Sequence, residues 1–318
     1  MNAVAIPRMS GALAAVGRSL VTLRPPVEAL AEAVPWSERH VADDPTGPRT
    51  AIEPMSAFGY AEDAIRRHDG HEDRLGFVGP IRPIDEAGVA QLARIAEALV
   101  DRAPTNPHIV SRRLRRADAY SPFLHAMVRS AAFLGAMSRL AGVPLMLHPH
   151  PDAAVQINYY LGDAGADAPQ LARWHTDGMD YVLTLLLSER GSYRGGEFRY
   201  FRGTRAAFEA LGGPPDDGRV ETADFREIGE GIFSRGSAIY HGVTPVTEGR
   251  RITLVVSLFC PYFHRNDGNR FWHSAPDDGL WATLGNWYRF RAPWLGTRDF
   301  LARAGEAIPS WDEVGAGR

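Results

Sequence analysis

Two stretches in the first half of the chain repeat apolar residues at helical spacing. The first, 85–102, places its apolar residues on one face and has Asp85 where an N-cap is expected. The second starts at Ser121-Pro122, a cap followed by a proline suited to the first turn, and ends at Gly142. We predict a helix over each, both packed as supports on the outside of a sheet, and a shorter helix over 27–34 within an irregular arm.

From Ala154 onward the pattern changes to strands. In 155–160 apolar residues alternate with residues that carry hydrogen-bonding groups, and the second set is Gln156, Asn158 and Tyr160. Further strands are predicted over 181–187, 195–201, 228–233, 238–241 and 251–260. In a small barrel, the polar set of such a strand can line the interior.

A length of 318 residues allows one large domain or two small ones, and we expect a single domain over 1–318. We expect a helical N-terminal extension over 1–150, a β core over 151–263 and a Trp-rich cover over 264–318. The cover carries Trp272, Trp281, Trp287, Trp294 and Trp311. Such an aromatic tail suits the outer face of a barrel or the interface of a homo-oligomer.

Charge and cysteine content exclude some classes of protein. The net charge of −3 gives no general attraction to nucleic acid, and Cys260, the single cysteine, is expected to be buried within a strand. No disulfide framework, spanning helix or signal-peptide core is visible, so we expect a cytoplasmic protein without a membrane partner.

Two charged segments leave alternatives open. The segment 58–78 suits a lid over an active site or an ordinary solvated loop. The basic run 112–116 suits a solvated face, or a contact with an anion on a substrate or with an acidic partner protein.

The candidate chemistry lies in His175-Thr176-Asp177 and in a distant His241. Residues i and i+2 of an extended chain point to the same side, so His175 and Asp177 can reach one ion. Two imidazoles and one carboxylate on one face of an octahedral metal leave the opposite face open, which suits non-haem Fe(II).

The sequence after His241 gives this pair its context. His241-Gly242-Val243-Thr244-Pro245-Val246-Thr247 is followed, ten residues after the histidine, by Arg251 and a β-branched strand. Over about 154–261 the chain resembles the Fe(II)/2-oxoglutarate-dependent dioxygenases, most closely their prolyl-hydroxylase-like branch. The resemblance implies a mainly β fold with flanking helices, the double-stranded β-helix or jelly roll.

The same resemblance assigns roles to residues. His175, Asp177 and His241 would hold Fe(II), and O₂ would take an open position on the metal. Arg251 and Thr253 match the family's Arg-x-Ser/Thr pair for the far carboxylate of 2-oxoglutarate, and strand alternation turns Arg250 the other way. Asn158 and Tyr160 resemble an Asn-x-Tyr pair that contacts 2-oxoglutarate in some relatives.

The implied activity is hydroxylation of an unactivated C–H bond in a small molecule, an amino acid or a natural-product intermediate, with succinate and CO₂ as co-products. Alternatives within the family are a peptidyl substrate such as proline, desaturation and ring closure. Alternatives outside it are a non-catalytic metal-binding jelly roll and a Zn²⁺ hydrolase. Neither of these needs an arginine for a co-substrate.

Overall fold

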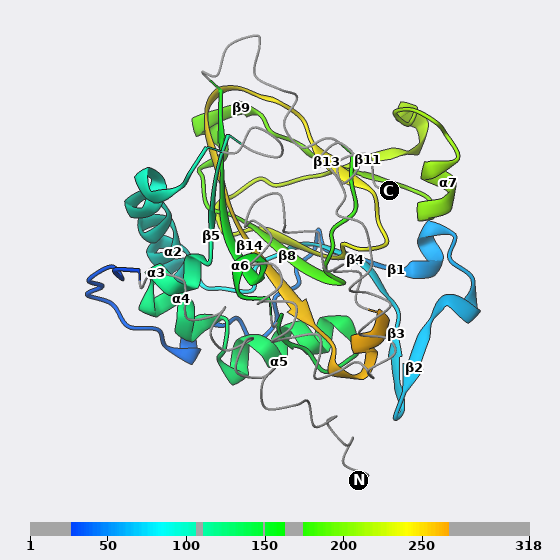
Figure 1. The fold of residues 1–318 in the computed structure, drawn as a ribbon, viewed down its shortest axis with the longest axis horizontal. Helices are drawn as coiled ribbons and strands as arrows, with labels where there is room; N and C mark the ends of the chain where they lie inside the picture. Colours follow the sequence, from blue (N-terminus) through cyan, green and yellow to red (C-terminus); the bar gives the residue numbers. More distant parts are fainter. Residues whose placement is uncertain (1–26, 106–110, 149, 163–173, 267–318) are drawn as a thin grey trace, which may run out of the picture.

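The computed structural model describes residues 27–105, 111–148, 150–162 and 174–266. Most of its strands join one antiparallel sheet of nine strands, called the major sheet here (Figure 1). Seven of them follow one another in the order β1 (Ala51–Pro54), β4 (Leu75–Ile81), β12 (Gly231–Arg235), β8 (Tyr181–Leu186), β14 (Val246–Phe259), β7 (Val155–Leu161) and β5 (Arg112–Arg115). The short strands β6 (Met146–Leu147) and β9 (Tyr193–Gly195) also pair with β14.

A smaller antiparallel sheet, the minor sheet, has the order β11 (Val220–Ala223), β10 (Phe198–Phe201) and β13 (His241–Val243). His175 adds a single bridge to it at His241. Along the chain, β7, β8, β12 and β14 of the major sheet alternate with His175, the β10–β11 pair and β13 of the minor sheet. This alternation between two sheets is that of a double-stranded β-helix, so the predicted fold class is confirmed.

The two sheets face each other across an apolar layer. The ring of Phe77 in β4 stacks on that of Tyr200 in β10, with ring centroids 4.4 Å apart. Leu186 and Ile232 of the major sheet and Phe198 of the minor sheet belong to the same buried cluster. The side of the major sheet that carries these residues is called its inner face below, and the opposite side its outer face.

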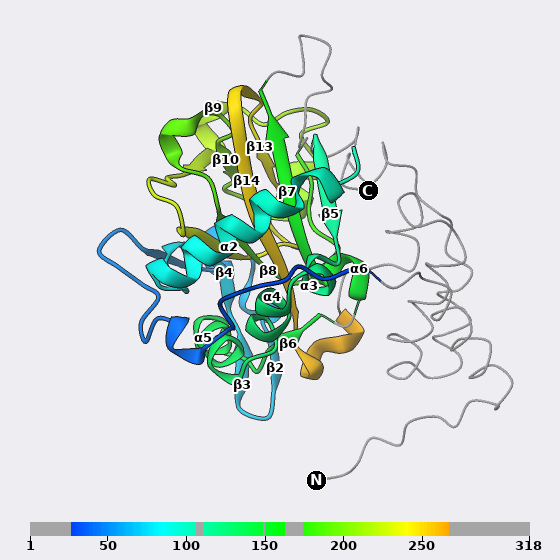
Figure 2. The same ribbon diagram turned by 90° about the vertical axis from the view of Figure 1, so that its left-hand side faces the viewer.

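The outer face is covered by helices, as Figure 2 shows for α2. Leu183, Leu254 and Val256 of the sheet share one buried core with Leu92 of α2 and Met137 of α5. The helices are α2 (Glu86–Leu99), α3 (Ala117–Tyr120), α4 (Pro122–Met127), α5 (Ala131–Ala141), α6 (Pro151–Ala154) and α7 (Arg205–Glu209). The short 3₁₀ turns are Glu38–His40, Met55–Phe58, Glu62–Ala64, Val100–Arg102, Arg190–Ser192, Asp217–Arg219 and Pro261–Asn266.

The helix starts predicted at Asp85 and Ser121 are confirmed, but the second of these predicted helices is two helices. Asp85 caps α2 by accepting a hydrogen bond from the Gly88 amide (2.7 Å), and Ser121 caps α4. The helix predicted to run on to Gly142 breaks after Met127, because Ser130 caps a new helix, α5. Both helices pack their apolar residues against the same hydrophobic core, which is why the apolar pattern continues across the break.

The prediction of a helix over 27–34 was wrong. Leu30 donates its amide to the Tyr120 carbonyl (2.8 Å), and the Glu32 carboxylate accepts hydrogen bonds from Ser121 Oγ (2.5 Å) and the Phe123 amide (2.6 Å). These contacts with the start of α4 hold the segment in an irregular conformation, overriding its helical propensity.

The N-terminal extension over 1–150 is not only helical. Of its described residues, β1, β4 and β5 extend the major sheet at both edges. The segment 58–78 is not simply a solvated loop, because it contains the hairpin of β2 (Arg66–His68) and β3 (His71–Asp73) and enters β4. Of the predicted cover over 264–318, all but the first three residues lie outside the described part of the chain.

Candidate functional site

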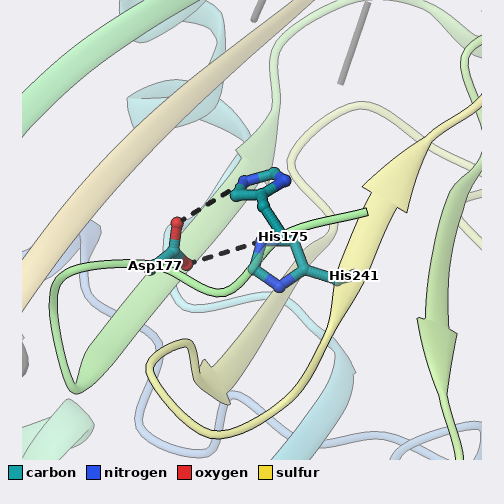
Figure 3. Close-up of side chains that lie close together, drawn as sticks. All are labelled: His175, Asp177 and His241. Atoms are coloured by element: carbon teal, nitrogen blue, oxygen red, sulfur yellow. Dashed lines mark ion pairs between the residues drawn. The ribbon is translucent and has the colours of Figure 1, made fainter. Parts of the chain in front are cut away.

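The backbone brings His175, Asp177 and His241 together before any side chain contributes. His175 and His241 exchange two backbone hydrogen bonds, each 2.9 Å long, which form the antiparallel bridge at the edge of the minor sheet. The Asp177 amide donates to the carbonyl of Gly236 (2.8 Å), just after β12. Two segments that are distant in sequence, 175–177 and 236–241, therefore meet, and Figure 3 shows the three side chains that they bring together.

Their side chains offer two nitrogens and one oxygen within a small volume. One ligand atom from each of the three residues can be chosen so that all lie within 4.8 Å of one another. Asp177 Oδ1 lies 3.8 Å from His175 Nε2, and Oδ2 lies 3.5 Å from His241 Nε2. In the described part of the chain, this is the one group of three or more such residues with this spacing. The donor set fits a divalent metal that retains open positions.

His241 is oriented by its neighbours. Its Nδ1 lies 3.0 Å from the Ile239 carbonyl, which only accepts, so Nδ1 carries the proton and Nε2 is left as the ligand atom. The Phe198 ring stacks on the imidazole, with centroids 5.2 Å apart and planes 16° apart. Burial raises the pKa of the preceding Tyr240 to about 12, with the Glu209 carboxylate contributing, so this phenol is neutral at physiological pH.

Gly236 is a site residue that sequence reasoning did not single out. A Cβ at this position would lie 2.3 Å from Asp177 Oδ2 and 2.9 Å from Val182 Cγ2. The close approach of its backbone to the carboxylate requires glycine. Its only sequence signal is its place five residues before His241, in Gly236-Ser237-Ala238-Ile239-Tyr240-His241.

Arg251 and Thr253 lie on the inner face of β14 and are almost fully buried, at 1% and 0% exposure. Within the described residues, neither Nε, Nη1 and Nη2 of Arg251 nor Oγ1 of Thr253 has a hydrogen-bond partner. The guanidinium lies 4.9 Å from the ring centroid of Tyr160. A buried cation of this kind costs several kcal/mol unless an anion compensates it.

The register brings the other two predicted residues to the same place. Tyr160 pairs with Arg251, and Asn158 with Thr253, across β7 and β14, so all four share the inner face. Asn158 Oδ1 is also buried without a hydrogen-bond partner in the described structure. A Cβ on Gly196 would lie 2.6 Å from Arg251 Cδ, so glycine at that position makes room for the arginine.

Arg250 points away from this site. It forms an ion pair with Glu97 of α2 on the helix side, and 37% of its side chain is exposed. The basic run 112–116 is divided in the same manner, because it contains β5. Arg113 pairs with Asn158 on the inner face and is buried, whereas Arg112 donates to the Val100 carbonyl (3.3 Å) on the other side.

Cys260 is buried, as expected, and burial raises the pKa of its thiol. Among the described helices, none has the length and apolar character needed to cross a bilayer.

No family model and no curated protein matches the chain. A comparison with solved structures finds the α-ketoglutarate-dependent epimerase SnoN from nogalamycin biosynthesis, at 15% identity, covering 58% of this chain and 78% of that chain with a TM-score of 0.44. It also finds HygX from Streptomyces hygroscopicus, solved with nickel and 2-oxoglutarate, at 17% identity, covering 59% of this chain and 84% of that chain with a TM-score of 0.42. A third is EctD from S. alaskensis, solved with 2-oxoglutarate and 5-hydroxyectoine, at 14% identity, covering 68% of this chain and 86% of that chain with a TM-score of 0.45.

The first of these proteins is α-ketoglutarate-dependent, and the other two were solved with 2-oxoglutarate bound. Their identities to this chain are below 20% and their TM-scores below 0.5. The assignment of a function therefore depends on the residues of the site.

Proposed function

We propose that this protein is an Fe(II)- and 2-oxoglutarate-dependent dioxygenase that hydroxylates an unactivated C–H bond of a small molecule. The observation that carries the proposal is the buried guanidinium of Arg251. It has no hydrogen-bond partner among the described residues and lies on the same inner face as Thr253, Asn158 and Tyr160. A dicarboxylate with one end on this guanidinium and the other on a metal held by His175, Asp177 and His241, the three-ligand site, would satisfy both.

His175, Asp177 and His241 would hold the metal, since their ligand atoms lie close enough to share one ion and leave other positions open. Fe(II) with 2-oxoglutarate and O₂ supplies the oxidant for the C–H bond, and succinate and CO₂ are the co-products. His241 presents Nε2, and Asp177 presents its carboxylate. The backbone of Asp177 is held in place by the hydrogen bond from its amide to the Gly236 carbonyl.

Arg251 would bind the far carboxylate of the co-substrate. Its guanidinium can form two parallel hydrogen bonds with a carboxylate, which the single ammonium of a lysine cannot do. The Thr253 hydroxyl would donate a third hydrogen bond. The apolar cluster between the two sheets, which includes Leu186 opposite Thr253 and Phe225 beside the guanidinium, would exclude water from this end of the site.

The alternatives outside this class do not explain the same residues. A Zn²⁺ hydrolase or a metal-binding module without catalysis would use the three ligands but would leave Arg251 as a buried charge without a function. Desaturation and ring closure would use all of these residues, and so would hydroxylation of a peptidyl proline. Product analysis distinguishes these reactions from hydroxylation of a small molecule.

The test is an anaerobic titration of the apoprotein with Fe(II) and then with 2-oxoglutarate, followed by visible absorption. We expect a weak charge-transfer band that requires both additions. Arg251→Ala should raise the Kd for 2-oxoglutarate about a hundredfold, because it removes charge-assisted hydrogen bonds worth about 3 kcal/mol.

Arg250→Ala is the matched control, because it removes the neighbouring arginine and only a partly exposed ion pair with Glu97. Its Kd for 2-oxoglutarate should equal that of the wild type. Binding of Fe(II) without any response to 2-oxoglutarate would contradict the proposal and favour the metal-binding alternatives.

A further inference from the structure

Four charged side chains, three of them buried and one part-buried, lie on the side of the helix-packed core, where the two cations lie over the rings of Phe263 and Tyr181. They are Arg66 of β2, Asp73 of β3, Asp180 just before β8, and Arg235 at the end of β12. Asp73, Asp180 and Arg235 are 1%, 4% and 6% exposed, and the side chain of Arg66 is 16% exposed. None of the four belongs to the proposed ligand sets.

These residues form one connected network. Arg66 donates from Nη1 to Asp180 Oδ2 (2.7 Å) and from Nε to Asp73 Oδ2 (2.6 Å), and Arg235 forms an ion pair with Asp73. The other oxygen of Asp180, Oδ1, accepts a hydrogen bond from Ser237 Oγ (2.5 Å). Two arginines and two aspartates balance in charge.

The network holds both segments that meet at Asp177. Asp180 follows Asp177 by three residues, and Arg235 and Ser237 are the two neighbours of Gly236, whose carbonyl accepts the Asp177 amide. Gly236 lies against the Asp177 carboxylate with no room for a Cβ. A shift of Ser237 relative to Asp180 would therefore move Gly236 relative to the metal-binding carboxylate.

Fold stability alone does not require this arrangement. Buried ion pairs lose much of their attraction to desolvation, and apolar groups of similar volume are often as stabilising. Apolar groups would not fix the orientation of the segment around Asp180 relative to the segment around Ser237. The Asp180 carboxylate does so, because each of its two oxygens accepts a directional hydrogen bond.

We propose that Arg66, Asp180 and Ser237 are positioning residues that set the affinity of the three-ligand site for its divalent cation. The inference rests on the metal site of the proposed function. The hairpin β2–β3, at the lower right of Figure 1, is then a fixed support for the segment 177–180, the metal-binding loop, which carries the Asp177 carboxylate.

The test compares Ser237→Ala with wild type by titrating the full-length apoprotein anaerobically with Co(II) and following its visible absorption. Loss of the Ser237 hydrogen bond should raise the Co(II) Kd about tenfold, the range seen when outer partners of metal ligands are removed. Ser237→Thr, which retains the hydroxyl, should restore the wild-type Kd.

Ser138→Ala is the matched control. Ser138 is a part-buried serine of α5 whose hydroxyl donates a 2.6 Å hydrogen bond to the Leu134 carbonyl, far from the metal-binding loop in sequence. It should change the Co(II) Kd less than twofold, whatever it does to the unfolding temperature. Arg66→Lys, which keeps the charge but not the two-sided contact, should weaken Co(II) binding as Ser237→Ala does.

A Co(II) Kd for Ser237→Ala within twofold of wild type would overturn the inference, and so would equal effects of Ser237→Ala and Ser138→Ala. The same titration continued with 2-oxoglutarate tests the proposed function separately. Tight Co(II) binding by wild type with no response to 2-oxoglutarate would remove the dioxygenase proposal but not the role of Ser237. Absence of Co(II) binding by wild type would overturn both.

Discussion

At the scale of single residues, the site depends on groups that are costly to bury and on space that only glycine leaves. Arg251 is a fully buried cation, and Gly196 leaves the space that its stem occupies. Gly236 does the same for Asp177. The two glycines are as much a part of the site as the charged groups beside them, since an added Cβ would displace those groups directly.

Gly236→Ala should therefore impair metal binding more than it impairs folding. The new methyl group would displace the Asp177 carboxylate, and overpacking of this kind costs about 1–3 kcal/mol of stability. We expect the Co(II) Kd to rise at least about tenfold by the same reasoning as for other misplaced ligands. Calorimetric titration measures it.

Gly213→Ala is the control for this change, because nothing lies within 4 Å of a Cβ at that position. It should leave both the unfolding temperature and the Co(II) Kd at their wild-type values. Unchanged Co(II) binding in Gly236→Ala would show that Asp177 has room to move, contrary to the observed packing.

At the scale of elements, the strands β7 and β14 were easier to predict from the sequence than the irregular segment 27–34. The alternation in 155–160 and the spacing of Arg251 and Thr253 follow from the period of two in a strand, so β7, β14 and the choice of Arg251 over Arg250 were accessible from the sequence. The conformation of 27–34 was not, because it depends on Glu32 bonding to the start of α4.

The same distinction separates the predicted ligands from the ion network. His175 and Asp177 are two residues apart and form a recognisable motif. Arg66 and Asp73 are opposite each other in the β2–β3 hairpin, but Asp180 and Arg235 come from distant parts of the chain, and no local pattern connects them to that hairpin. Their contacts depend on which strands become neighbours, which a single sequence does not specify.

Loss of the N-cap of α2 should destabilise the fold without altering the site. Asp85 accepts the Gly88 amide, and Asp85→Ala leaves that donor unsatisfied, at a cost of about 1 kcal/mol. Chemical denaturation should show a lower midpoint with an unchanged slope. A changed Co(II) Kd in this variant would mean that α2 supports the site more directly than its place on the outer face implies.

At the scale of the whole molecule, one sheet separates two environments. Its outer face is a continuous apolar core with α2, α4 and α5, and its inner face carries the polar groups of the proposed site. Stability can therefore reside mainly on one side and chemistry on the other. Ligand binding on the inner face should be visible as added stability of the entire fold, because the strands are shared.

Metal binding should accordingly raise the unfolding temperature. At about 100 times its Kd, an ion that binds only the folded state adds about 2.7 kcal/mol. Scanning calorimetry under anaerobic conditions with Mn(II) should show an increase of several degrees that a chelator reverses. Asp177→Ala should show no increase, and an equal increase in that variant would place the ion elsewhere.

The sharing of β14 between these two environments has a consequence for insertions and deletions. Arg251 and Thr253 face inward while Ile252 and Leu254 face the helices, and β7 and β8 fix this register from both sides. A one-residue slip of β14 would exchange the two sets. It would place two aliphatic side chains among the polar groups of the inner face and an arginine in the apolar core beneath the helices. Insertions or deletions that β14 tolerates should therefore come in pairs of residues, because only an even shift returns every side chain to its own face of the sheet.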